Sequence, residues 1–174
     1  MLVIHESLSD VDMSATAEKY KYMKDELLHF LFENLYNLCQ LEKEIYIRSV
    51  QLNNEKLDLG IPSHQTHPHD KGLWAEYKDR YREMIMPICT ETLIARGFAG
   101  SFGEPAEYDY LNTGCEKIFF IMKSRSRAVV EIHYEYGIGK MHQFVLQLKD
   151  GEWKINEKNY GFTSEIDRWH KDHI

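Results

Sequence analysis

The sequence predicts an α+β fold in which long amino-terminal helices pack on a bent antiparallel meander sheet. Apolar residues recur at helical spacing through residues 15–58 and 70–96, and they alternate with polar residues through residues 116–157. With 174 residues, 43% of them hydrophobic, the chain is long enough to bury one substantial core. We therefore expect a single domain over residues 1–174.

The first helical region is an arm over residues 15–58. Its apolar residues recur every three or four positions from Tyr20 to Leu52. Gly60 and Pro62 follow and supply a stop signal. The pattern predicts one long helix or two helices joined at a kink.

The second helical region spans residues 70–96. A stripe of aromatic and aliphatic residues runs along it, with Asp70 as the expected amino-terminal cap and Gly97 as the terminator. Pro87 lacks a backbone N–H and should kink this helix.

Four antiparallel strands are expected within residues 116–157. They are residues 116–123, 127–136, 140–149 and 152–156. Asp150-Gly151 is the preferred two-residue hairpin turn, and it pairs Leu148 with Trp153. On the same face it pairs Leu146 with Ile155.

The preceding hairpin is expected to have a three-residue loop, residues 137–139. This loop places Ile132 opposite Phe144 in the core, and Tyr134 opposite His142 on the same inner face. After the sheet, residues 164–172 resemble a short capped helix whose apolar residues pack inward.

Charge and hydropathy exclude some classes of partner. The chain has 28 acidic and 21 basic residues, a formal net charge of −7, which repels phosphate backbones and anionic lipids. We therefore expect no nucleic-acid or membrane partner, whereas a basic protein would be attracted. The amino terminus lacks a basic segment followed by an apolar run, and no stretch reaches the roughly 18 apolar residues of a membrane span, so we expect a cytoplasmic protein.

The segment HQTHPHD, residues 64–70, contains residue types that bind metals. Its candidate ligands are His64, His67, His69 and Asp70. Pro68 separates two of the histidines, and neither a cysteine nor a further ligand lies nearby. We therefore interpret the segment as a solvated linker between helices and expect neither a metal nor a cofactor.

One candidate site lies inside the predicted fold. Tyr134 and His142, with Tyr110 or Tyr108 nearby, could form an acid-base pocket there, although such residues are also ordinary in protein cores. No inward-facing carboxylate is evident on the predicted strands, which weakens the catalytic interpretation.

A second candidate site is acidic and lies outside. Glu131, His133 and Glu135 alternate on the outer face, which is either the solvated side of the sheet or a binding surface. The apolar residues on that face suggest a cover: the carboxy-terminal helix, a second copy in a homodimer, or a partner. The loop residues Glu104, Glu107 and Asp109 could extend an acidic binding surface.

Four segments together resemble a known family. They are LWAEYKDRYREMIMPICTETL, FGEPAEYDYL, HQFVLQLKDGEWKINEKNYGF and RWHKDHI. They are similar to immunity proteins of bacterial polymorphic toxin systems, of the Rhs type, which have the nuclear transport factor 2-like (cystatin-like) cone fold. The resemblance implies a protein that binds and neutralises one cognate toxin and has no enzymatic activity.

The alternative is a small-molecule enzyme or ligand-binding protein that uses the interior of the cone. An open pocket with a buried carboxylate would favour this alternative, whereas a filled interior with an acidic outer surface would favour toxin binding.

Overall fold

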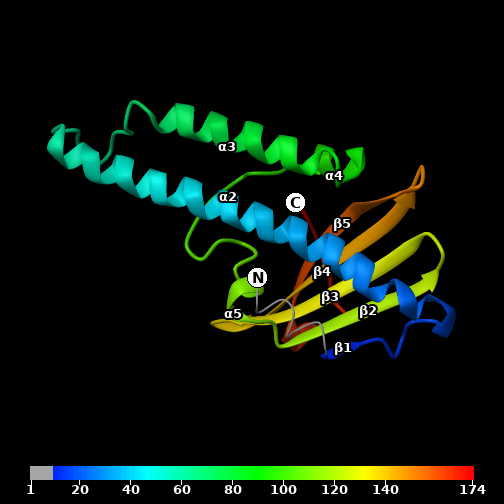
Figure 1. The fold of residues 1–174 in the computed structure, drawn as a ribbon. Helices are drawn as coiled ribbons and strands as arrows, with labels where there is room; N and C mark the ends of the chain where they lie inside the picture. Colours follow the sequence, from blue (N-terminus) through cyan, green and yellow to red (C-terminus); the bar gives the residue numbers. More distant parts are fainter. Residues whose placement is uncertain (1–9) are drawn as a thin grey trace.

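The structure is a computed structural model that describes residues 10–174 (Figure 1). Its helices are η2 (Glu18–Met23), α2 (Lys24–Asp58), α3 (Asp70–Ile85), α4 (Glu91–Arg96), α5 (Tyr110–Thr113) and η3 (Thr163–Glu165). Its strands are β1 (Val11–Asp12), β2 (Lys117–Ser124), β3 (Arg127–Tyr136), β4 (Ile138–Lys149), β5 (Glu152–Phe162) and β6 (His170–Asp172). They form one sheet in the order β1 to β6, so the predicted α+β fold is confirmed. The expectation drawn from the extreme amino terminus concerns residues 1–9 and lies outside the described residues.

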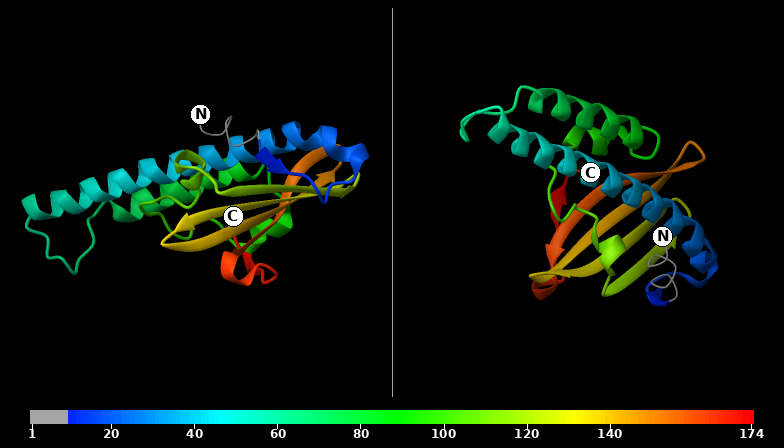
Figure 2. Two further views of the ribbon diagram at one scale, coloured as in Figure 1. Left: turned by 90° about the horizontal axis from the view of Figure 1, so that it is seen from below. Right: turned by 60° about the vertical axis from the view of Figure 1, so that its left-hand side comes forward.

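α2 is one continuous helix that crosses one face of the sheet, and α3 lies beside it (Figures 1 and 2). The buried residues of α2 begin at Leu27 and end at Ile45. Beyond Ile45 the helix extends past the sheet and packs on α3, where Arg48 pairs with Glu76 at 2.6 Å. No helix within residues 10–174 has the length and apolar character needed to cross a bilayer.

The second helical region is divided in two rather than kinked. α3 ends at Ile85, and α4 begins only at Glu91. Pro87 lies in the gap, where its missing N–H and its ring oppose a continuous helix. The intervening backbone instead bonds to β5: Ile155 N donates to Ile88 O at 2.7 Å, and Thr90 N donates to Ile155 O at 3.0 Å.

The β4–β5 hairpin has the predicted register. Leu148 lies opposite Trp153, and Leu146 lies opposite Ile155. Asp150 and Gly151 occupy the turn with φ values of 52° and 83°, the positive values that a type I′ turn requires.

The predicted register of the β3–β4 hairpin is wrong by two residues. Ile132 lies opposite His142 rather than Phe144, and Tyr134 lies opposite Lys140. The ladder continues to Tyr136 and Ile138, so the connection is shorter than the expected loop over residues 137–139. Because side chains alternate with period two, a shift of two residues leaves the same residues on the inner face.

A β-bulge in β5 decides which charged residue enters the core. Ile155 lies opposite Leu146 and Glu157 lies opposite Val145, so Asn156 is an extra residue in this strand. Lys158 therefore lies opposite Phe144, on the inner face. Strict alternation from Ile155 would have placed Lys158 on the outer face.

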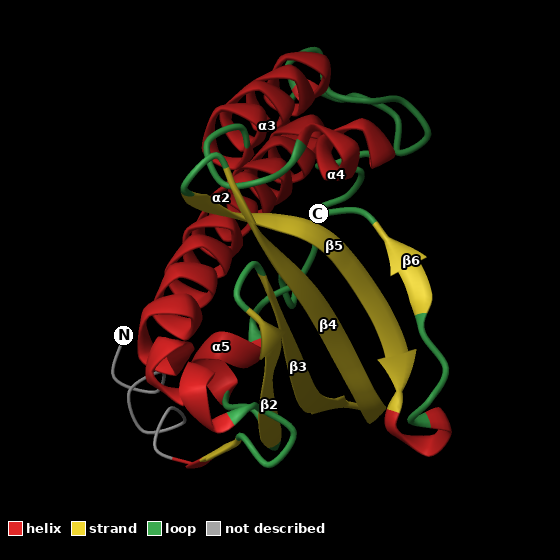
Figure 3. Cartoon of the chain, turned by 90° about the vertical axis from the view of Figure 1, so that its right-hand side faces the viewer, coloured by secondary structure: helices red, strands yellow, loops and turns green. Residues whose placement is uncertain are grey.

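The predicted carboxy-terminal helix over residues 164–172 is wrong. After the single turn of η3 the chain reverses, and β6 pairs with β5 so that Asp172 lies opposite Lys158 (Figure 3). Pairing satisfies backbone groups along the free edge of β5, which a short helix would leave unpaired. Ile166, expected to pack inward, is exposed, whereas the terminal Ile174 is buried.

Candidate functional site

A cavity of about 750 Å³ opens at the end of the sheet opposite the Asp150-Gly151 turn. The loop that precedes α5, α5 itself and the adjoining ends of β3, β4, β5 and β6 contribute to its lining. Its volume lies within the range of about 300–1,000 Å³ that is usual for ligand pockets. The cavity lies at one end of the fold, whereas a continuous hydrophobic core fills the space between α2 and the rest of the sheet.

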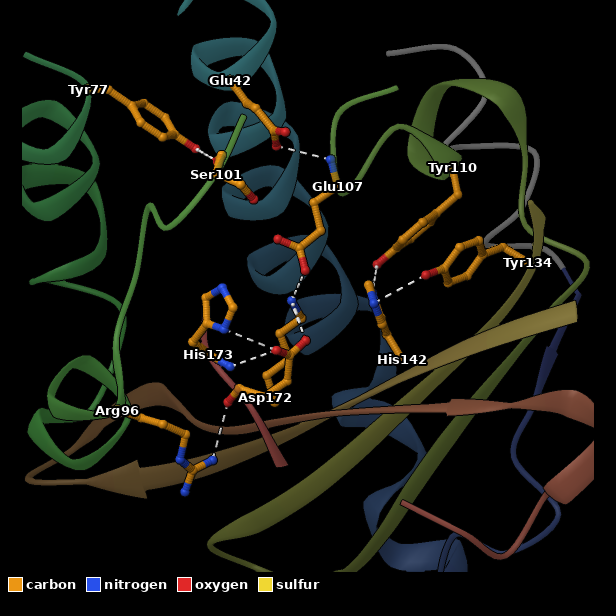
Figure 4. A network of polar contacts seen from close by, with 11 residues as sticks. Glu42, Tyr77, Arg96, Ser101, Glu107, Tyr110, Tyr134, His142, Asp172 and His173 are labelled. Atoms are coloured by element: carbon orange, nitrogen blue, oxygen red, sulfur yellow. Dashed lines mark hydrogen bonds and ion pairs between the residues drawn. The ribbon is translucent and has the colours of Figure 1, made fainter. Parts of the chain in front are cut away.

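His142 is buried in the cavity wall between two tyrosines (Figure 4). Its Nδ1 lies 3.0 Å from the Tyr110 hydroxyl, and its Nε2 lies 3.2 Å from the Tyr134 hydroxyl. Burial lowers the pKa of His142 well below 6.5, and the nearby Lys158 and Lys140 add to this effect. A neutral imidazole has one donor and one acceptor, so one tyrosine accepts a hydrogen bond and the other donates one.

The two tyrosines are themselves held in place. The rings of Tyr110 and Tyr134 stack with their centroids 4.3 Å apart. Burial raises the pKa of both hydroxyls, so both are protonated at neutral pH. The structure thus brings together the three residues expected to form an interior pocket.

Lys158 is a fully buried cation beside the cavity. Its ammonium pairs with Glu107, which lies in the loop before α5, and lies 3.0 Å from Asp172 of β6. It also lies 5.0 Å from the centre of the Tyr108 ring. Because Glu107 and Asp172 both line the cavity, Lys158 neutralises part of its negative charge from behind the wall.

Glu42 of α2 fixes the loop that carries Glu107 (Figure 4). Its carboxylate accepts hydrogen bonds from Gly103 N at 3.1 Å and from Glu107 N at 3.0 Å. Burial raises the pKa of Glu42, and the adjacent charge of Glu107 raises it further. Nearby, the Tyr77 hydroxyl donates to Ser101 O at 3.1 Å, which ties the same connection to α3.

The structure divides the acidic residues predicted to bind a toxin. Four of them line the cavity with Tyr110, Tyr134 and His142: Glu104, Glu107, Asp109 and Glu135. Glu131 and His133 do not line it. On the outer face Glu131 accepts a hydrogen bond from Gln143 at 3.1 Å, and the His133 ring packs on Phe119 with centroids 5.1 Å apart. Burial lowers the pKa of His133.

Sequence reasoning missed Lys158, Asp172 and Glu42. No inward-facing carboxylate was expected on the four predicted strands, but Asp172 lines the cavity from β6, a strand that was not predicted. The segment that contains Asp172 was expected to be helical. The bulge that turns Lys158 inward has no local sequence signal. Only the helical position of Glu42 among buried leucines could have suggested that it points inward.

Within residues 10–174, the side chains of Glu107, His142 and Asp172 could form a metal site, because one ligand atom of each lies within 4.8 Å of the others. The arrangement does not suit a metal ion. The Lys158 ammonium already binds both carboxylates, and both nitrogens of His142 lie within hydrogen-bonding distance of tyrosine hydroxyls. A divalent cation would have to displace these contacts.

The histidine segment is a linker between α2 and α3, but it is not solvated throughout. His67 is only 3% exposed, and its Nδ1 accepts a hydrogen bond from His69 N at 3.1 Å. Asp70 begins α3 instead of preceding it, and its carboxylate accepts a hydrogen bond from His67 N at 2.8 Å.

Comparisons with protein-family models, curated proteins and solved structures found no match to this chain.

Proposed function

We propose that this chain is a cytoplasmic immunity protein that binds and neutralises a basic toxin domain at the mouth of the cavity. One observation carries the proposal: exposed apolar side chains lie beside acidic ones at this mouth. Tyr136 and Tyr160 line the cavity and are 54% and 38% exposed. Glu104 and Glu135 are exposed in the same lining, and neither forms an ion pair with another of the described residues.

General properties of interfaces support a protein partner. Exposed apolar patches bordered by polar groups mark interaction surfaces, and tyrosine is enriched among the residues that contribute most to binding. The net charge of −7 would attract a basic partner and repel nucleic acid. The assignment of the partner as a toxin rests on the resemblance to immunity proteins of the nuclear transport factor 2-like fold.

A second candidate function is a small-molecule enzyme or ligand-binding protein. It is favoured by an open cavity in which Glu107 and Asp172 lie close to His142. Catalysis is less well supported than binding, because a general base needs a free acceptor directed at the substrate. Here Lys158 pairs with both carboxylates, and His142 has a tyrosine hydroxyl next to each nitrogen.

Co-expression with the product of the neighbouring toxin gene tests the proposed function. The wild-type chain should protect cells and form a complex, whereas the double variant Glu104→Lys/Glu135→Lys should associate more slowly and protect less. The matched control is Glu131→Lys on the outer face, which should protect as the wild type does. Failure of the wild type to bind or protect against any adjacent gene product would contradict the immunity function.

The second candidate has its own test. Tyr134→Phe removes only the hydroxyl that contacts His142, so an enzyme using this network would lose turnover, whereas toxin protection would persist. Protection that persists in this variant supports the binding function.

A further inference from the structure

We infer that the cavity receives a guanidinium group, supplied by an arginine side chain of the partner. The source of the arginine rests on the proposed function, whereas the chemistry of the cavity does not. Three features carry the inference: excess negative charge, aromatic rings in the lining and a buried cation that belongs to the chain itself.

The cavity is negatively charged after its own ion pairs are counted. Five carboxylates line it: Glu104, Glu107, Asp109, Glu135 and Asp172. Three ammonium groups oppose them, since Lys158 pairs with two of the carboxylates, Lys43 pairs with Asp109, and Lys140 lines the cavity. Two negative charges are therefore left over. Glu104 and Glu135 are the carboxylates that have no ion-pair partner among residues 10–174.

Aromatic rings line the same cavity. Tyr110 and Tyr134 stack in its wall, and Tyr136 and Tyr160 reach its mouth. Lys140 already lies 5.0 Å from the centre of the Tyr136 ring, and His170 stacks on Tyr160 at 5.1 Å. Ring faces beside carboxylates attract cations through both the ring quadrupole and the carboxylate charge.

Lys158 shows that this part of the fold can accommodate a desolvated cation. Its ammonium is fully buried, paired with two carboxylates, and positioned 5.0 Å from the Tyr108 ring. A cation from a partner would meet the same combination of groups on the open side of the wall.

A guanidinium suits the lining better than an ammonium or a metal ion. It is planar, so it can stack on a tyrosine ring while its N–H groups donate to a carboxylate in pairs. The chain already supplies ammonium groups to this site, from Lys140 and Lys158, and Lys158 occupies the position between Glu107 and Asp172 that a metal ion would need.

The first experiment uses the whole chain and two small probes. N-acetyl-arginine methylamide is titrated into the ¹⁵N-labelled protein, alongside the neutral citrulline analogue of nearly the same shape. The arginine probe should shift the amide signals of residues 134–136 and 160–162, and the citrulline probe should bind about tenfold more weakly because it lacks the charge. Equal affinity for the two probes, or shifts confined to other surfaces, would overturn the inference.

Variants of the two unpaired carboxylates test the residues involved. Glu104→Gln and Glu135→Gln should each weaken the arginine probe about two- to five-fold, since each removes one partly screened charge. Glu83→Gln is the matched control, because Glu83 is an exposed acid of α3 outside the cavity lining, and it should leave the affinity unchanged. No weakening in either cavity variant would contradict the proposed recognition.

A competition experiment identifies the source of the guanidinium. A saturating amount of the neighbouring toxin domain should prevent the arginine probe from binding. If the complex forms and the probe still binds with unchanged affinity, the inference about the partner's arginine is wrong, while the immunity function stands. If no toxin binds, the immunity function fails together with the assignment of the arginine to a toxin, and the probe titration alone decides whether the cavity binds guanidinium.

Discussion

Lys158 and Asp172 form a buried ion pair, 3.0 Å between Nζ and Oδ2, across the last two strands of the sheet. The pair depends on the bulge at Asn156, which turns Lys158 inward, and on the return of the chain terminus along β5. Because Lys158 also pairs with Glu107, one side chain connects β5, β6 and the loop before α5. The wall of the cavity is therefore assembled from segments far apart in the sequence.

Replacing Lys158 with methionine should destabilise the fold by about 3–5 kcal/mol, because it leaves the Glu107 and Asp172 carboxylates without their cation. Urea unfolding of the variant measures this loss. Lys171→Met is the matched control: Lys171 is an exposed residue of β6 that pairs with Glu157, so its removal should cost less than about 1 kcal/mol. Equal losses in the two variants would show that Lys158 is not buried as described.

His142 should make stability depend on pH. Its pKa is lowered in the folded state, so below about pH 6.5 the unfolded chain binds a proton that the folded chain does not. The contribution of neutral His142 to the free energy of unfolding is fully present above pH 6.5. It is lost as the pH falls below that value, at up to about 1.4 kcal/mol per pH unit. Urea unfolding at a series of pH values measures it.

The variant His142→Gln isolates this contribution, because glutamine does not titrate. The difference in unfolding free energy between wild type and variant should shrink as the pH falls. A constant difference for His142→Gln would contradict the lowered pKa.

Gly151→Val should destabilise the β4–β5 hairpin by about 1–3 kcal/mol. A Cβ at this position would meet no atom within 4 Å, so the cost would come from the φ of 83° alone. Gly151→Asn should cost less, since asparagine tolerates positive φ better than valine does. Thermal or urea melts of the two variants measure the difference, and equal stabilities would count against the type I′ turn.

His67→Ala should cost about 1–2 kcal/mol, whereas His64→Ala should change stability by less than about 0.5 kcal/mol. The reason is that His67 is buried, packs against the tilted His69 ring at a centroid distance of 5.3 Å, and accepts a hydrogen bond from His69 N. His64 is exposed. Urea unfolding compares the two variants, and equal effects would show that the linker is solvated throughout.

Much of the candidate site was within reach of sequence reasoning. The alternation of β3 and β4 placed Tyr134 and His142 on one face, and this survived a register error of two residues because the period of a strand is two. The acidic character of the loop before α5 was also evident. The positions of Lys158 and Asp172 were not evident from the sequence. The extra residue in β5 moves every later side chain of that strand to the opposite face of the sheet.

The sequence by itself determined the features that depend on local chemistry. Helical spacing determined α2 and α3, and the conformational freedom of Asp-Gly determined the β4–β5 turn and its register. Pro87 marked an interruption in the sequence, but tertiary structure decided that the helix breaks there rather than kinks. Tertiary structure alone decided the bulge at Asn156 and the strand β6 where a helix was expected. Each of these depends on backbone partners distant in sequence: the segment between α3 and α4 bonds to β5, and β6 pairs along its edge. The cavity and the buried Lys158 beside it form because segments distant in sequence come together at one end of the sheet. A local sequence pattern cannot predict such long-range contacts.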